Sequence, residues 1–273
     1  MDWLMRQKRV LVVALLAAAL SGAPEAAADF LGGDNFNDNI KDTTRWGPDV
    51  VGGGAGALNE TNSRLEYTTS LVSGGVNNAV RPWILNQGAY NLSWFVQMDA
   101  FIGFTSPATG VFHGGNISLG VDNHADSGDS ANLQFADVNG QRVVRIGVFR
   151  DGFTQLFLDT PAANSSLVTL RIAFDAVGQT LTFLFDGDGP AGGLALSPIT
   201  SISIGSGSAN WGMDASSLFD ARIFGAAGEV VITSGQLFAD NFVAESVPEP
   251  GTLALLGCAI SLIALRRRRA PRV

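Results

Sequence analysis

The chain has 273 residues with 17 basic and 25 acidic side chains, so its formal net charge at neutral pH is −8. A chain this acidic excludes binding to nucleic acid or to anionic lipid through a basic patch. The single cysteine, Cys258, excludes an internal disulfide, so any folded domain must be held by its hydrophobic core.

Residues 1–28 have the three parts of a secretory signal peptide. Basic residues, the last of them Arg9, precede an apolar run at 10–20, and alanines at 26–28 supply an A-x-A cleavage site. We predict export and cleavage before Asp29; an uncleaved anchor is the alternative. With both chain ends set aside, 9 basic and 22 acidic residues remain (17 less 8, and 25 less 3).

Residues 29–246 consist of short apolar alternations separated by turns rich in Gly, Asn, Asp and Ser. Every second residue from Leu92 to Ile102 is apolar, which predicts a strand with one buried face. Similar runs predict strands at 64–68, 117–121, 133–136, 143–148, 154–158, 202–204, 219–224 and 237–243, and a hairpin formed by 169–174 and 180–185. No amphipathic helix is evident between the chain ends. This pattern predicts an all-β antiparallel sandwich or barrel in one domain.

Glycine-rich and repeated segments give three local expectations. Residues 50–58, VVGGGAGAL, predict a mobile loop, because glycine-rich backbone holds a regular strand poorly. Residues 187–197 predict a second loop. The tripeptide DNF occurs at 34–36 and again at 240–242, so we expect the first and last strands to lie side by side.

Part of this region resembles a known fold family. The segment DNFND at 34–38, followed by Trp46 and by NSRLEY at 62–67, is similar to the opening of concanavalin A-like, LamG-type jelly rolls. The segments LRIAFD at 170–175 and LTFLFDG at 181–187 resemble their hairpin. The resemblance implies that residues 29–246 form a jelly-roll β-sandwich.

Residues 247–270 form a tail with three parts in fixed order. A stiff, non-helical Pro-Glu-Pro comes first. The uncharged residues 251–265 follow; as a helix they span about 22 Å, short of a hydrocarbon core of about 30 Å. Four arginines then extend the span by reaching the headgroups and, by the positive-inside rule, lie in the cytoplasm. We predict one C-terminal transmembrane helix; a buried core helix is the alternative. Its motif residues are Pro248, Glu249, Pro250, Arg266, Arg267, Arg268 and Arg269.

These tail residues resemble the PEP-CTERM sorting signal of Gram-negative bacteria. The resemblance implies recognition and cleavage near Pro-Glu-Pro by an integral-membrane exosortase, in organisms that secrete exopolysaccharide. It therefore implies a protein that is exported, anchored in the inner membrane before processing, and then found at the cell surface or in the extracellular matrix. It says little about residues 29–246, because such tails are attached to unrelated domains.

Catalytic signatures are missing from the sequence. Glucanases related to these jelly rolls carry E-x-D-x-E on one strand, because retaining hydrolysis needs two carboxylates about 5–5.5 Å apart. The glutamates of the middle region, Glu60, Glu66, Glu229 and Glu245, fit no such motif, and we expect Glu60 and Glu66 to be solvated strand residues. GxSxG and HExxH are also missing. We predict a protein that is not an enzyme.

One acidic segment is a candidate metal site. The predicted loop VDNHADSGDS at 121–130 places Asp122, Asn123, Asp126 and Asp129 close together, and oxygen ligands at this density suit Ca²⁺. The alternative is that these residues only form turns, as Asp and Asn commonly do. His113 and His124 are read as turn residues rather than as a metal pair. We expect no other cofactor.

Trp46, Trp83 and Trp211 lie outside the regular alternations. Such rings can stack on sugars from a sandwich surface, or can fill the core. The tail and the jelly-roll resemblance lead us to expect a non-catalytic surface or matrix protein that binds or organises extracellular polysaccharide. The alternatives are a structural matrix protein without a ligand, and an enzyme with an unrecognised site.

Overall fold

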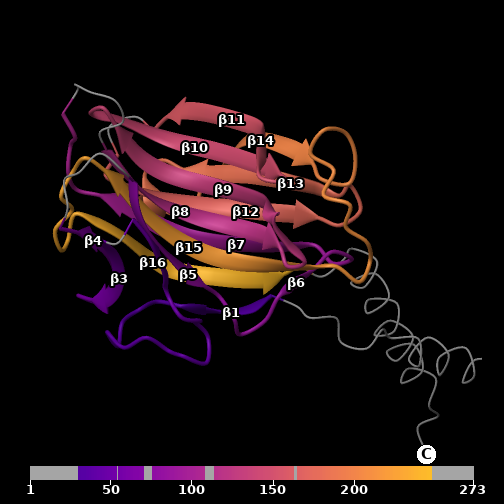
Figure 1. Cartoon of the computed structure of the whole chain (residues 1–273), viewed down its shortest axis with the longest axis horizontal. Helices are drawn as coiled ribbons and strands as arrows, with labels where there is room; N and C mark the ends of the chain where they lie inside the picture. Colours follow the sequence, from indigo (N-terminus) through magenta and orange to yellow (C-terminus); the bar gives the residue numbers. More distant parts are fainter. Residues whose placement is uncertain (1–29, 54, 71–75, 108–113, 163–164, 248–273) are drawn as a thin grey trace, which may run out of the picture.

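The computed structural model describes residues 30–53, 55–70, 76–107, 114–162 and 165–247. Over these residues the chain forms two antiparallel sheets stacked as a sandwich (Figure 1), and the 3-10 turn η1 (Gly189–Gly192) is the one helical element described. The all-β sandwich is thus confirmed. The predicted signal peptide and the tail from Pro248 onward lie outside the described residues. Within them, no helix is long and apolar enough to cross a bilayer.

Sheet I and sheet II each contain eight strands. Sheet I has the order β14 (Ser197–Ser203), β13 (Thr180–Asp186), β12 (Leu167–Asp175), β7 (Trp94–Ile102), β16 (Leu237–Ser246), β4 (Arg64–Thr69) and β3 (Gly56–Thr61), with β1 (Leu31–Asp34) also paired to β16. Sheet II has the order β11 (Phe153–Pro161), β10 (Gln141–Arg150), β9 (Asp126–Val138), β8 (Gly114–Asn123), β15 (Leu218–Gly228), β5 (Val76–Pro82) and β2 (Val50–Gly52), with β6 (Gly88–Ala89) paired to β15.

The core lies between the sheets and follows the alternation of the sequence. The inward residues of β7 are completely buried and face those of β8, among them Ile117, Leu119 and Val121. Each such side chain stabilises the fold by about 1.5–3 kcal/mol. The predicted strands are present, and β12 pairs with β13 as the predicted hairpin. The alternation of apolar and polar residues predicted these strands correctly because each sheet buries only one of its two faces.

The first and last strands lie side by side, as the repeated DNF predicts. β1 runs antiparallel to β16, with Asp34 opposite Phe242. The ring of Phe242 lies 5.0 Å from both Trp46 and Trp83, and the Trp46 indole N–H donates to the Asp34 carboxylate at 2.8 Å. Buried aromatic rings therefore join the opening segment of the domain to its closing strand.

Two loop predictions were wrong. Within residues 50–58, β2 pairs with β5 and β3 begins at Gly56. A Cβ at Gly56 would lie 2.8 Å from the Tyr67 hydroxyl, so close packing explains this glycine. Within residues 121–130, β8 and β9 continue to a turn at 124–125. The predicted loop at 187–197 is confirmed except at its last residue: η1 is its one regular element up to residue 196, and Ser197 begins β14.

Candidate functional site

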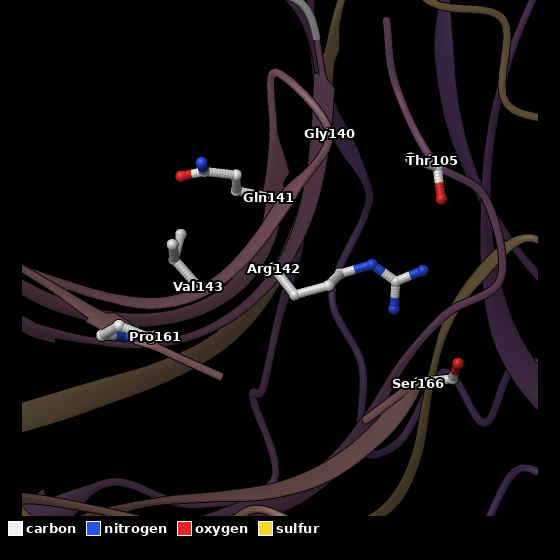
Figure 2. Close-up of a pocket in the computed structure, with 7 residues that line it drawn as sticks. All are labelled: Thr105, Gly140, Gln141, Arg142, Val143, Pro161 and Ser166. Carbon is white, nitrogen blue, oxygen red and sulfur yellow. The ribbon is translucent and has the colours of Figure 1, made fainter. Parts of the chain in front are cut away.

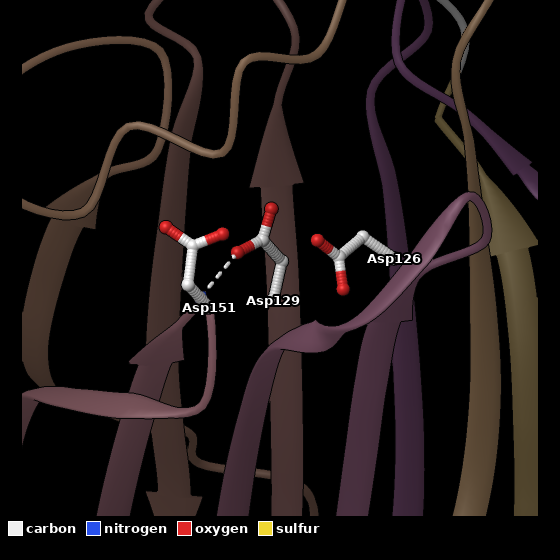
Figure 3. Close-up of side chains that lie close together, drawn as sticks. All are labelled: Asp126, Asp129 and Asp151. Carbon is white, nitrogen blue, oxygen red and sulfur yellow. Dashed lines mark hydrogen bonds between the residues drawn. The ribbon is translucent and has the colours of Figure 1, made fainter.

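Three carboxylates meet at one end of sheet II. Asp126 and Asp129 lie on β9, and Asp151 lies in the turn between β10 and β11; one ligand atom from each lies within 4.8 Å of the others (Figure 3). The two hairpin turns are adjacent because β9 pairs with β10. The Asp151 amide donates to Asp129 Oδ1 at 2.9 Å, and Gly152 N–H donates to the Gly128 carbonyl at 2.9 Å. Carboxylates from two turns at this spacing could hold a hard cation such as Ca²⁺.

The structure brings together only part of the predicted metal set. Asp126 and Asp129 belong to the cluster, whereas Asp122 pairs with Arg222 instead. Asn123 supports the cluster, since its amide donates to Asp129 at 3.3 Å. Asp151 was missed. The dipeptide Asp-Gly at 151–152 marks a hairpin turn in the sequence, but its contact with another hairpin depends on long-range pairing.

A strip of polar side chains crosses the outer face of sheet II; we define it as Asn116, Ser118, Asp122, Ser130, Asn132 and Gln134. Their strand neighbours Ile117, Leu119 and Val121 point into the core, so these alternate residues point outward. Even so, Ser118 is 0% and Asp122 7% exposed. Neighbouring side chains therefore cover most of the strip, and only Asn132 and Gln134 are partly exposed. Ser118 lies opposite Gln134 on β9 and Phe224 on β15.

Asp122 is the charged end of this strip. It forms an ion pair with Arg222, whose guanidinium also lies 3.4 Å from the Asn132 amide oxygen. Arg222 reaches across Gly120, where a Cβ would lie 2.9 Å from its Nε. Burial raises the pKa of Asp122 to about 7, with Arg222 acting against this shift and Asp220 adding to it. Its Oδ1 is buried without a hydrogen-bond partner among the described residues, so this acceptor is covered rather than presented to solvent.

The structure corrects the prediction that Trp46, Trp83 and Trp211 could stack on sugars. Trp46 and Trp83 are each 1% exposed and Trp211 is 5% exposed. The Trp211 indole donates to the Phe149 carbonyl at 3.0 Å. None of these rings has a free face for a sugar. Among the described residues of sheet II, the aromatic rings that are exposed are Phe153 and Phe157 on β11.

Two glutamates predicted as solvated are inside the domain. Glu66 is completely buried. Burial raises its pKa, but hydrogen bonds from Asn62, Ser234 and Arg64 outweigh this effect and bring the pKa below its usual value. Glu60 forms an ion pair with buried Arg81, and burial raises the pKa of Glu60. Both residues therefore stabilise the fold and are not available at the surface.

A cavity of about 590 Å³ opens at the opposite end of sheet II (Figure 2). It is lined by Thr105, Gly140, Gln141, Arg142, Val143, Pro161 and Ser166. Arg142 is the only ionisable residue among them, and it donates to the Phe104 carbonyl at 2.8 Å and the Ser165 carbonyl at 3.2 Å. Its guanidinium is thus used in holding loops together. His113 lies outside the described residues, and His124 contacts Asp220 at 2.9 Å.

Known structures place the domain among lectin-like jelly rolls. Ulex europaeus lectin I, in complex with the methyl glycoside of α-L-fucose, shares 10% identity with a TM-score of 0.52, covering 81% of this chain and 98% of the lectin. The CBM2 module of the evolved Dit of Lactobacillus casei BL23 phage J-1 shares 14% identity with a TM-score of 0.52, covering 82% and 98%. Bacteroides ovatus xyloglucan PUL GH43B shares 17% identity with a TM-score of 0.51, covering 79% of this chain but only 39% of that protein. At these identities the likeness establishes the fold alone.

The tail is recognised independently of the domain. The family described as PEP-CTERM protein-sorting motif matches residues 246–269. The resemblance of the tail to this signal is therefore confirmed, and the chain combines a lectin-like jelly roll with the sorting motif of exosortase-processed surface proteins. No curated protein matches the sequence.

Proposed function

We propose that this protein is a non-catalytic, surface- or matrix-associated domain of a Gram-negative bacterium that binds extracellular polysaccharide. An inner-membrane exosortase sorts it and cleaves it near Pro248–Pro250. Before that step a C-terminal helix anchors it, with the four arginines in the cytoplasm. The sorting motif at 246–269 and the lectin-like fold support this proposal.

The polar strip is the observation that carries polysaccharide binding. The partly exposed amides of Asn132 and Gln134 both donate and accept, which matches the hydroxyl groups of sugars. Phe157, 58% exposed, lies on the edge strand in line with Asn132, with Gly147 of β10 between them. Arg145 lies over its ring at 4.8 Å, and the exposed remainder of the ring offers a surface on which a sugar can stack.

Calcium binding at Asp126, Asp129 and Asp151 is a second part of the proposal. The ion would join the β8–β9 turn to the β10–β11 turn, next to the Asp122 end of the strip. Oxygen ligands and exposure of two of the three carboxylates suit a cation that keeps some bound water. Its role is to hold the turns in place rather than to perform chemistry.

The test is binding of the full-length protein in detergent to an array of bacterial polysaccharides that includes the host's own. The double variant Asn132→Ala/Gln134→Ala removes two donors from the strip and is expected to weaken binding at least about tenfold. The matched control is Thr182→Ala/Ser201→Ala, which removes a hydrogen-bonded polar pair from the outer face of sheet I. This control should bind as the parent does.

Other outcomes select the alternatives. Absence of binding to every polysaccharide would leave a structural matrix protein. Release of reducing ends during incubation would instead indicate an enzyme with an unrecognised site. If both double variants bind polysaccharide equally weakly, the binding site is not on the outer face of sheet II.

A further inference from the structure

The folded domain extends up to the sorting motif without a spacer. The Ser246 amide donates to the Phe30 carbonyl at 2.8 Å, and the Val247 amide donates to the Ser93 carbonyl at 2.7 Å. Val247 is therefore still fixed to the sandwich. The next residue, Pro248, has no N–H with which to continue this bonding.

Only Pro248, Glu249 and Pro250 separate Val247 from the apolar run that begins at Gly251. Extended chain covers at most about 3.3–3.6 Å per residue, so the domain is held within about 15 Å of the start of that run. A folded domain of even 100 residues has a radius of gyration of about 13 Å. An enzyme that reaches these three residues while the apolar run is in the membrane must therefore contact this end of the sandwich.

The surface around Val247 carries exposed apolar side chains on two sides. On the first side is Leu31, 68% exposed, whose carbonyl accepts a hydrogen bond from Asn86 at 2.8 Å. On the second side is the β12–β13 turn, tied to Ser93 by a bond from the Ala176 amide at 3.1 Å, with Val177 84% exposed. Val247 itself is exposed between them.

A shallow cavity of about 470 Å³ continues the second side. Its lining includes Tyr90, Asn91, Ala176, Val177, Met213 and Ala215. Exposed apolar residues next to a cavity are typical of surfaces that contact a partner. We call Leu31, Val177, Met213 and Val247 the exit face, since the sorting tail leaves the domain among them.

We propose that the exit face is a docking surface for the membrane-embedded peptidase that cleaves the tail, and that apolar contact with this face speeds cleavage. The inference rests on the proposed exosortase sorting. The short connection requires contact here, and the exposed residues supply its chemistry. Lipid headgroups are the less favoured occupant, because the acidic turns lie at this same end. Two backbone hydrogen bonds to adjacent residues show that the β8–β9 turn and the cavity lie at the same end. The His124 amide of the turn donates to the Leu218 carbonyl, and the Tyr90 amide of the cavity donates to the Ser217 carbonyl.

The experiment follows cleavage of the full chain by the cognate exosortase in proteoliposomes. Val177→Glu and Leu31→Glu each place a charge on the exit face, and each is expected to slow cleavage about fivefold to tenfold. Val231→Glu and Leu194→Glu are matched controls, since both residues are exposed and apolar but lie at the opposite end. The controls should be cleaved at the parent rate. Thermal unfolding of each variant checks that the domain is intact.

A second chain carries ten Gly/Ser residues between Val247 and Pro248, which adds about 17 Å of flexible reach. In this background Val177→Glu should no longer slow cleavage, because the peptidase can reach the motif without touching the domain. Parent-like cleavage of the short-linker exit-face variants would overturn docking, as would a loss that the long linker does not relieve. Changed association of Val177→Glu with peptidase-free vesicles would assign the face to lipid instead. If the parent chain is not cleaved at all, the sorting proposal itself is wrong.

Discussion

Arg81 on β5 of sheet II forms an ion pair with Glu60 on β3 of sheet I, with 2.6 Å between Nη1 and Oε1. The same guanidinium makes two bonds to Asp49, at 2.9 and 3.0 Å, and one to the Leu58 carbonyl at 2.9 Å. Both members of the pair have almost no exposed side-chain surface. This pair links the two layers at one edge of the sandwich.

Replacement of Arg81 by methionine should therefore lower the free energy of unfolding by about 3–5 kcal/mol, because it leaves the buried Glu60 charge without a partner. Arg145→Met is the control. Its partner Asp159 is well exposed, so the loss should be about 0–1 kcal/mol. Urea unfolding followed by tryptophan fluorescence measures both. Similar losses in the two variants would show that the Arg81 pair has no special structural role.

Asp122 should make stability depend on pH. Its folded pKa of about 7 lies above the usual 3.8, so the folded protein holds a proton that the unfolded chain releases between about pH 4 and pH 7. Stability linked to Asp122 is therefore lost as pH rises through this window. Asp122→Asn stays neutral and should gain on the order of 1–3 kcal/mol relative to the parent at pH 8, but little at pH 4. A stability difference that does not change with pH would contradict this account.

Calcium should raise the melting temperature of the full-length protein. At a concentration 100 times the Kd, binding stabilises the folded state by about 2.7 kcal/mol. Asp151→Asn should remove most of this gain, whereas Asp175→Asn, at the end of β12 in sheet I, should keep it. Differential scanning calorimetry with Ca²⁺ and with EDTA makes the comparison. Identical melting curves in the two solutions would exclude the site.

The two parts of the tail should fail in different ways. Under the proposed anchoring, replacing residues 266–269 with serines removes the charges that retain a short apolar run, so the full-length domain should leak past the membrane. Replacing residues 248–250 with alanines should leave the protein anchored and unprocessed. Cell fractionation with immunoblotting separates the two outcomes. The same fate for both variants would mean that anchor and recognition motif are not separable.

The sequence was sufficient for the parts of the fold in which one face of a strand is buried. β7 and the β12–β13 hairpin follow directly from alternation, and the repeated DNF predicts the pairing of β1 with β16. The loop predicted over β2 and β3 was wrong because the sequence does not distinguish a glycine required by close packing from a glycine in a loop. Gly56, which packs against Tyr67, is of the first kind.

The candidate site could be predicted only in part. Asp126 and Asp129 are neighbours in sequence and in space, but Asp151 joins them through the pairing of β9 with β10. Trp46 and Trp83 lie outside the alternations because their rings join separate segments inside the core, and not because they face a ligand. The polar strip was not found, because its residues occupy the outward positions of strands whose inward positions carry the apolar signal.

The position of β16 determines when the domain can close. β16 is the last strand described, yet it lies between β7 and β4 in the middle of sheet I. Until it arrives, β3 and β4 have no link to the rest of their sheet, and β7 has an open edge. Chains are made from the N-terminus, so this gap is filled only once residue 246 has been made. A chain cut short before β16 should remain open and exposed to proteases, which makes completion of the sandwich a check on chain length.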